Sequence, residues 1–109
     1  EKNIKLEKSV ELAKRALLFE PENSAYLDTM GWAQYKLGNY EKALKFIESA
    51  VRIDMSKNNR SDPVILEHLG DIYFKTGEKE KALLNWKKAY RNSESEELKN
   101  KIDNADISK

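Results

Sequence analysis

The only histidine of this 109-residue chain, His68, follows one carboxylate, Glu67, and lies three residues before another, Asp71. Side chains three residues apart lie on one face of a helix, so we expect an imidazole–carboxylate contact here. A general base could use such a pair, whereas a metal site needs several convergent ligands. The chain has no cysteine and no second histidine. We therefore predict no catalytic residue, no metal site and no cofactor.

The glycines and serines indicate no other chemistry. Gly31 and Gly38, and likewise Gly70 and Gly77, form pairs with six residues between their members. Each pair spans a predicted helix and turn, whereas a phosphate-binding loop joins a strand to a helix. The serines lie in predicted loops, at helix starts or on a helix surface, without a histidine-based triad. Enzymatic activity is not expected.

Instead, the two glycine pairs reveal an internal repeat. The second pair follows the first at an offset of 39 residues, and at this offset residues 41–44 and 80–83 have the same sequence. Residues 7–10 resemble this tetrapeptide at an offset of 34. Periods of about 20–50 residues are typical of solenoids. Five extra residues of the second interval lie in the polar segment 56–62, a predicted long loop that is either a contact element or tolerated length variation.

Each full copy is predicted to contain two antiparallel helices. Apolar residues recur at helical spacing over 23–37 and 40–54, and again over 63–76 and 79–92. The second glycine of each pair follows a helix and suits the left-handed residue that ends it. The first lies inside a helix, where glycine costs roughly 1 kcal/mol relative to alanine. We expect the paired helices to approach closely there.

One domain in four parts is predicted. Residues 1–21 are assigned to the second helix of a truncated repeat, so the chain is expected to be part of a larger protein. Residues 22–55 and 62–94 are assigned to full repeats. Residues 95–109 are assigned to a C-terminal capping helix, because the end of a repeat stack needs a polar cover.

The repeated positions resemble the tetratricopeptide repeat (TPR) family. The second full unit carries Leu66, Leu69, Gly70, Tyr73, Gly77, Ala82, Trp86 and Ala89. The first carries Leu27, Met30, Gly31, Gly38, Tyr40, Ala43, Ile47 and Ala50. Departures occur where Gln34 and Lys79 replace aromatic residues, and where Met55 and Glu94 replace the terminal proline. The resemblance implies an all-α fold: an α-α superhelix (TPR solenoid) of antiparallel helix pairs with a C-terminal capping helix. It implies no catalysis.

The same resemblance implies a concave groove, lined by the first helix of each pair, that binds a peptide or partner helix. By position, the groove residues are Asp28, Trp32, Tyr35, Lys36, Glu67, His68, Asp71, Phe74 and Lys75. Acidic groups would repel a partner's C-terminal carboxylate, so we expect a ligand with apolar side chains and a few basic residues. Aromatic residues dominate interface hot spots. The alternative is that Trp32, Tyr35 and Phe74 pack against the neighbouring helix or a missing upstream repeat.

The predicted function is therefore a protein–protein interaction scaffold. The net charge of +1 provides no broad field for nucleic acid or anionic lipid. No apolar run approaches the roughly 18 residues that a membrane span needs. Binding of RNA by a helical repeat is disfavoured because Asp28, Glu67 and Asp71 are acidic.

A second hypothesis is structural. The chain would self-associate as a homo-oligomer through exposed repeat ends, with the N-terminal helix as the contact. The expected open face of that helix consists of Leu6, Val10, Ala13 and Leu17.

Overall fold

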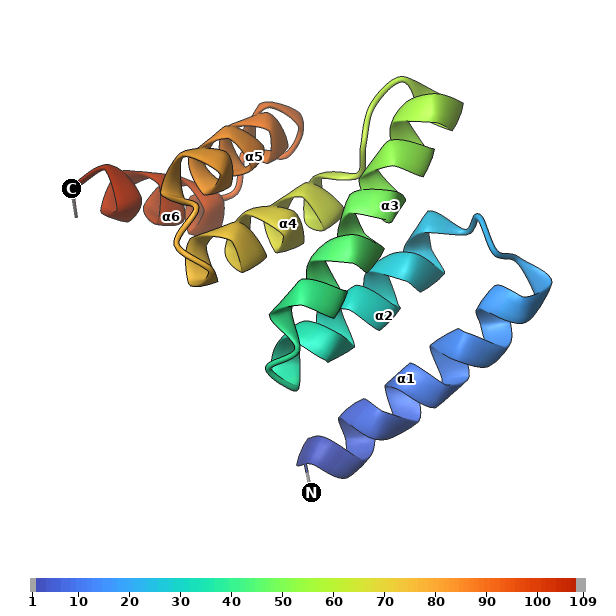
Figure 1. Cartoon of the computed structure of the whole chain (residues 1–109). Coiled ribbons are helices and arrows are strands. Elements are labelled where there is room, and N and C mark those ends of the chain that lie inside the picture. The colour runs from blue at the N-terminus through green and yellow to red at the C-terminus, as the bar shows by residue number, and fades with distance from the viewer. Residues whose placement is uncertain (1, 108–109) are drawn as a thin grey trace. The chain divides into compact units, whose positions relative to one another are not determined.

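A computed structural model describes the backbone of residues 2–107 and the side chains of residues 5–105. Within this range the chain is helical and contains no strand (Figure 1). The helices are α1 (Lys2–Phe19), α2 (Ser24–Lys36), α3 (Tyr40–Asn58), α4 (Pro63–Lys75), α5 (Lys79–Asn92) and α6 (Glu96–Ile107). The all-α fold class is confirmed. The predicted capping helix ends at 109, and residues 108–109 lie outside the described part, as does residue 1.

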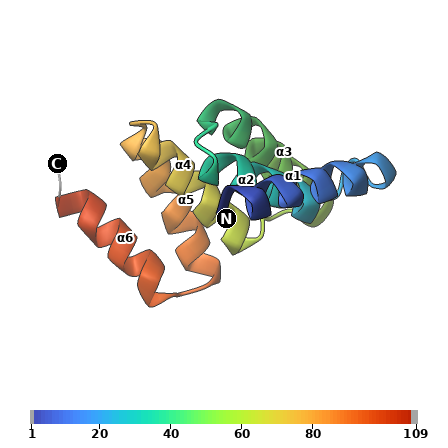
Figure 2. The same ribbon diagram turned by 90° about the horizontal axis from the view of Figure 1, so that it is seen from below.

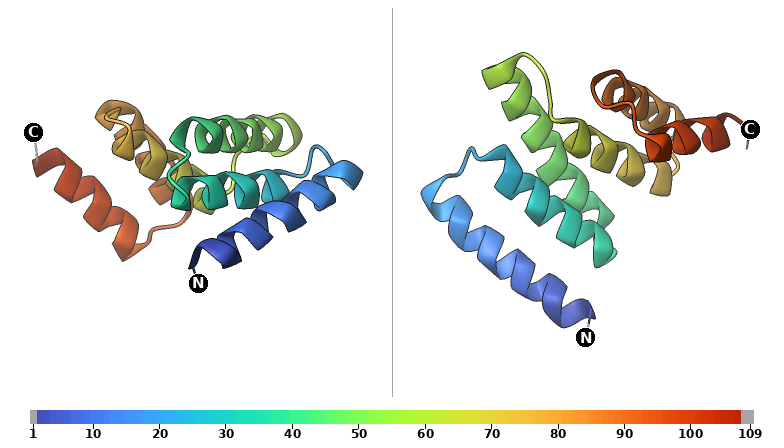
Figure 3. Two further views of the ribbon diagram at one scale, coloured as in Figure 1. Left: turned by 60° about the horizontal axis from the view of Figure 1, so that its bottom comes forward. Right: turned by 180° about the vertical axis from the view of Figure 1, so that it is seen from behind.

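The helices form two compact units, Glu1–Ser61 and Asp62–Lys109, here called unit 1 and unit 2. In unit 1, α2 packs against both α1 and α3, and lies between them in both views of Figure 3. In unit 2, α5 packs against both α4 and α6. Each unit therefore contains one antiparallel helix pair and one further helix.

The glycine inside the first helix of each pair allows the predicted close approach. A Cβ atom added to Gly31 would overlap the side chain of Ile47 and lie 3.1 Å from the carbonyl oxygen of Ala43. Unit 2 repeats this arrangement at Gly70, where the added atom would overlap the ring of Trp86. Any larger residue would force the facing side chain or the paired helices to move, so the expectation of close contact is confirmed.

The glycine between the paired helices has a different role. Gly38 has φ of 88° and Gly77 has φ of 89°, a left-handed conformation that glycine adopts without the steric cost of a side chain. No atom lies within 4 Å of a Cβ built at either position. Backbone conformation, and not lack of space, therefore selects glycine at these turns, as predicted.

Helix α3 is longer than the sequence pattern indicated. It was expected to end at 54, before a loop over 56–62, but residues 56–58 continue the helix. Asn59 ends it with φ of 61°, and its N–H donates to the carbonyl oxygen of Met55 at 3.0 Å. The last turn is polar and exposed, so it carries no apolar periodicity. The predicted long loop is therefore wrong, and the connection is residues 59–62.

Another correction concerns α1. The residues expected to form its open face (Leu6, Val10, Ala13 and Leu17) are partly or fully buried in unit 1. Among the side chains of α1 that the structure describes, the large apolar ones that are exposed are Leu12, Leu18 and Phe19. The prediction assigned the apolar stripe to the free side of the helix, whereas α1 uses it for packing within the unit.

Candidate partner-binding surfaces

Polar contacts hold the start of α2 in place. The side chain of Asn23 caps the helix by accepting a hydrogen bond from the backbone N–H of Tyr26 at 3.0 Å. Asp54, near the end of α3 and only 7% exposed, accepts hydrogen bonds from Ser24 Oγ at 2.6 Å and Ser61 Oγ at 3.4 Å. These bonds fix α2 against α3. Sequence reasoning missed Asp54, although a carboxylate inside an apolar helical stripe was a usable signal.

The end of α2 and the start of α3 carry an aromatic cluster, which we define as Trp32, Tyr35 and Tyr40. The rings of Trp32 and Tyr35 are stacked, with centroids 4.7 Å apart and planes at 19°. Tyr40, the first residue of α3, lies 5.6 Å from Tyr35. The Nζ atom of Lys36 lies over the Trp32 ring at 5.1 Å. Tyr35 thus contacts the neighbouring helix α3, which agrees with the alternative interpretation that the aromatic residues pack against a neighbouring helix. All three rings of the cluster nevertheless remain partly accessible to solvent.

Four predicted groove residues of unit 1 lie close together. Asp28 is half-buried and one helical turn before Trp32, so the two share a face of α2. Tyr35 and Lys36 continue that face by one more turn. The resulting surface combines a carboxylate, stacked rings and an ammonium group, which can contact a peptide through both apolar and ionic groups.

In unit 2, the corresponding face of α4 contains an ion-pair network. Lys101 of α6 donates from Nζ to Glu67 Oε2 at 2.5 Å and to the two carboxylate oxygens of Asp71 at 3.0 and 3.1 Å. The buried indole of Trp86 donates from Nε1 to Asp71 Oδ1 at 3.1 Å and to the carbonyl oxygen of Glu67 at 3.3 Å. Two predicted groove residues are therefore brought together, and both are bonded to another part of their own unit.

The environment of Lys101 raises its pKa above the usual 10.5. Burial is the largest single influence and acts to lower the pKa. Hydrogen bonds to Glu67 and Asp71, together with the negative charges of both carboxylates, outweigh it. The ammonium form is thus favoured in the folded chain. Lys101 was not among the predicted site residues, because its position depends on how α6 packs.

The remaining predicted residues of α4 are spread along the helix. His68 is half-buried. Phe74 is exposed on one side, and its ring lies 5.5 Å from that of Trp86 at an angle of 37°. Lys75 is exposed in the last turn. Phe74 therefore contributes to packing and to the surface at once.

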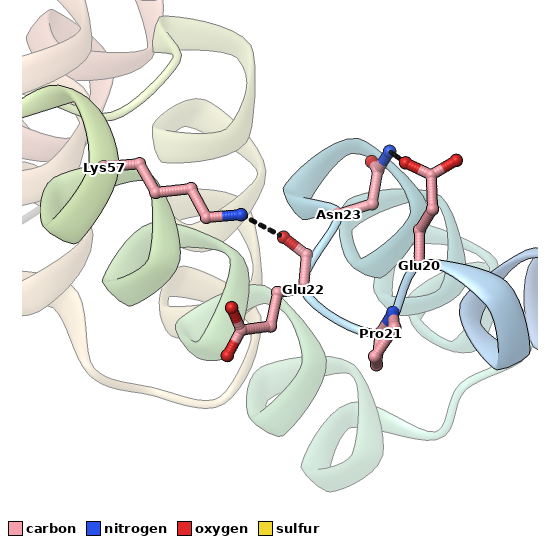
Figure 4. A pocket seen from close by; sticks show the side chains of 5 residues that line it. All are labelled: Glu20, Pro21, Glu22, Asn23 and Lys57. Atoms are coloured by element: carbon pink, nitrogen blue, oxygen red, sulfur yellow. Dashed lines mark hydrogen bonds between the residues drawn. The ribbon is translucent and has the colours of Figure 1, made fainter.

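Unit 1 also has an open depression of about 530 Å³, lined by Glu20, Pro21, Glu22, Asn23 and Lys57 (Figure 4). Lys57 Nζ donates to the carbonyl oxygen of Glu22 at 3.2 Å, and Asn23 Nδ2 donates to Glu20 Oε1 at the same distance. The lining groups thus bond to one another across and beside the depression. They form no nucleophile–base pair.

Two searches of the described residues bear on other functions. None of their helices is long and apolar enough to span a membrane. Nor do residues in the described range bring three or more histidine, aspartate or glutamate side chains into a group that could hold a metal ion.

Two antiparallel pairs, each with a glycine contact and a glycine turn, define a helical-repeat protein. A family model for the tetratricopeptide repeat matches residues 24–56, which cover α2 and most of α3. A comparison with curated proteins gives no match. Solved structures similar to this chain include two TPR proteins. Together these findings place one tetratricopeptide repeat at residues 24–56 and give the chain the fold of TPR proteins.

Three of these structures illustrate the likeness. A thermophilic TPR protein of Thermus thermophilus has a TM-score of 0.76 and 21% identity over 94% of this chain, which spans only 50% of that protein. The first TPR of Spaghetti (RPAP3), bound to an HSP90 peptide, has a TM-score of 0.85 and 15% identity, covering 98% of this chain and 82% of that one. The Yersinia enterocolitica chaperone SycD has a TM-score of 0.80 and 14% identity, covering 98% and 76%. At these identities the likeness concerns the fold.

Proposed function

We propose that the chain is a protein-interaction module and that the α2 face of unit 1 binds a peptide or helix of a partner protein. The aromatic cluster carries this proposal. Its stacked rings are partly accessible, and they are held in place by contacts within α2 and with the start of α3. Rigid, partly exposed aromatic residues supply contact area at low entropic cost.

The fold supports the same proposal. Among the similar structures, the Spaghetti domain holds an HSP90 peptide. PcrH, with a TM-score of 0.70 and 15% identity, is in complex with the chaperone binding region of PopD. Binding of a partner segment, without catalysis, is therefore the activity that we infer for this chain.

The chemistry of the α2 face limits the class of peptides that it can bind. Asp28 would pair with a basic side chain, and the aromatic cluster would take apolar side chains beside it. Lys36 adds a positive group at one end of the face. We expect a short segment with apolar residues and a few basic ones. His68, Phe74 and Lys75 of unit 2 remain proposed contacts of the same kind.

A peptide array tests the proposal. Short peptides that combine basic and aromatic residues are probed with the chain and with its Trp32→Ala variant. Binding of the selected peptides should fall by about tenfold or more in that variant, because a truncated hot-spot residue costs about 2 kcal/mol.

The matched control is Leu84→Ala, which removes a side chain that is 51% exposed on α5, the second helix of its pair. Its binding profile should equal that of the unchanged chain. If Trp32→Ala also leaves the profile unchanged, the α2 face is not the binding surface.

Self-association is a second candidate, favoured by the apolar side chains that α1 exposes. Phe19 is 85% exposed and Leu18 81% exposed, both in the last turn of the helix. Sedimentation velocity over a range of concentrations tests it. A shift to larger species that Phe19→Ser abolishes would support self-association, and a single species at all concentrations would exclude it.

A further inference from the structure

Helix α6 is held in unit 2 by few side chains. Among its described residues only Leu98 and Ala105 are buried, each 2% exposed. Lys101 lies between them in sequence and extends to α4, while the helix itself packs on α5. Figure 2 and the left view of Figure 3 both show α6 starting near the end of α5 and leaving the α4–α5 pair at an angle. Lys101 is thus a main anchor of this helix.

The acceptor site for Lys101 is complete in its hydrogen bonding. An ammonium group has three N–H donors, and three carboxylate oxygens of Glu67 and Asp71 lie within 3.1 Å of Nζ. The side chains of Asp71 and Glu67 are only 15% and 25% exposed. The group is therefore bound as a ligand would be, in a partly desolvated position.

That site is built without α6. Both carboxylates come from α4, and Trp86 of α5 orients that of Asp71 by donating to its Oδ1 atom, while the same N–H also contacts the backbone carbonyl of Glu67. Trp86 is itself fixed in the core, where it lies against Gly70. The α4–α5 pair thus supplies every acceptor of this ammonium site, and Lys101 is its occupant.

We propose that this site is a lysine receptor that α6 fills within its own chain, and that a lysine-bearing helix of a partner protein fills it by displacing α6. The proposal rests on the proposed function, because it names the partner class for a second surface of the same module. The occupant has a stated form: a helix that presents a large apolar residue, a lysine three residues later and a small apolar residue four residues after that. This is the spacing of Leu98, Lys101 and Ala105.

A partner helix that fills the site must compete with α6, which is tethered to the site as part of the same chain. A helix joined by a short linker has an effective concentration in the millimolar range, so a free helix with the same contacts displaces it poorly. A true partner must add contacts or meet a weakened α6. Weakening α6 therefore exposes the receptor to a probe of known sequence.

The probe is a fluorescein-labelled peptide with the sequence of residues 93–109, and a matched peptide replaces its lysine at position 101 by glutamine. Each is titrated by fluorescence anisotropy against the full chain and against the full-length Lys101→Gln variant. The lysine peptide should bind the variant about three- to fivefold more tightly than it binds the unchanged chain, as expected for one partly exposed ion pair. The glutamine peptide should show no such preference.

Further variants separate the receptor from general loosening. Adding Glu67→Gln and Asp71→Asn to the Lys101→Gln chain should remove the preference for the lysine peptide. Lys99→Gln makes the same charge change in α6, but Lys99 pairs with Asp103 of its own helix at 3.8 Å, so this variant should behave as the unchanged chain. Hydrogen exchange should show faster exchange of α6 in Lys101→Gln, with α4 and α5 protected.

Equal binding of the two peptides to the Lys101→Gln chain would overturn the proposal, as would failure of the lysine peptide to bind it. Loss of protection throughout α4 and α5 would also overturn it, since Lys101 would then be a general stabilising residue. Failure of the proposed function has a different signature, because the Trp32 experiment concerns the α2 face of unit 1.

Discussion

The α2–α3 pair and the α4–α5 pair meet the same backbone requirement with different side chains. In both, a glycine of the first helix faces a residue of the second helix at close range. That residue is Ile47 opposite Gly31, but Trp86 opposite Gly70. Isoleucine fills the contact without any polar atom, whereas an indole brings an N–H group into the core.

The polar atom has consequences on the neighbouring helix. A buried indole N–H needs an acceptor, and Asp71 provides one at 3.1 Å. At the position equivalent to Asp71, unit 1 has Trp32. No hydrogen-bond acceptor is required there, because Ile47, the counterpart of Trp86, has no side-chain N–H group. A core residue on the second helix can therefore determine which residue follows the buried glycine on the first helix. Unit 1 is left with an aromatic surface, and unit 2 with a charged one that Lys101 neutralises in part.

The largest expected difference between the pairs concerns the buried glycines. Gly70→Ala should lower the free energy of unfolding by about 3 kcal/mol, because the added methyl group meets the rigid ring of Trp86. Gly31→Ala should cost about 1.5 kcal/mol, because the side chain of Ile47 can rotate away. Urea denaturation of both variants measures this. Equal losses, or a larger loss at Gly31, would contradict the comparison.

A smaller effect tests the link between Trp86 and Asp71. In a double-mutant cycle, Trp86→Phe and Asp71→Ala should show a coupling of about 1 kcal/mol, the usual worth of a hydrogen bond to a partly buried carboxylate. The matching cycle in unit 1 combines Ile47→Val with Trp32→Ala and should give a smaller coupling, since isoleucine donates no hydrogen bond. Equal coupling in both cycles would mean that packing, and not the indole N–H, connects the two positions.

The smallest effect is the pH dependence of the Lys101 ion pair. A lysine whose folded pKa is raised stabilises the fold fully below its unfolded pKa, near 10.5, and this contribution is lost as pH rises through the folded pKa. The unfolding free energy of the chain should therefore exceed that of Lys101→Gln by a constant amount from about pH 7 to about pH 9. The difference should be below about 1 kcal/mol, because the pair is partly exposed.

Denaturant titrations at a series of pH values up to the alkaline range measure this difference. It should shrink only above about pH 10.5. A difference that already disappears near neutral pH would show that another group, and not the lysine ammonium, controls the contact.

Most of the fold could be predicted because its determinants are local. The apolar periodicity and each glycine pair lie within one helix and the turn that follows it, and they located both helix pairs. The end of α3 was missed because residues 56–58 are polar, and only the left-handed conformation of Asn59 marks the boundary.

The candidate site could be predicted only in part. Register within the repeat selected Asp71 and Trp32, since both occupy the same place in their helices. Their partners could not be derived this way, because Lys101 reaches Asp71 from a helix that lies 30 residues further along the chain. One signal was available in the aligned repeats. The second repeat has Trp86 where the first has Ile47, and it has Asp71 where the first has Trp32.

The two indoles can also serve as intrinsic fluorescence probes of the two units. It contains two tryptophans, one in each unit: Trp32 is partly exposed beneath a lysine, and Trp86 is buried beside a carboxylate. Indole emission shifts to longer wavelength in water, so Trp32 should emit at longer wavelength than the buried Trp86 and should be more accessible to soluble quenchers. Each unit thus carries its own fluorophore, so the emission of Trp32 reports on unit 1 and that of Trp86 reports on unit 2.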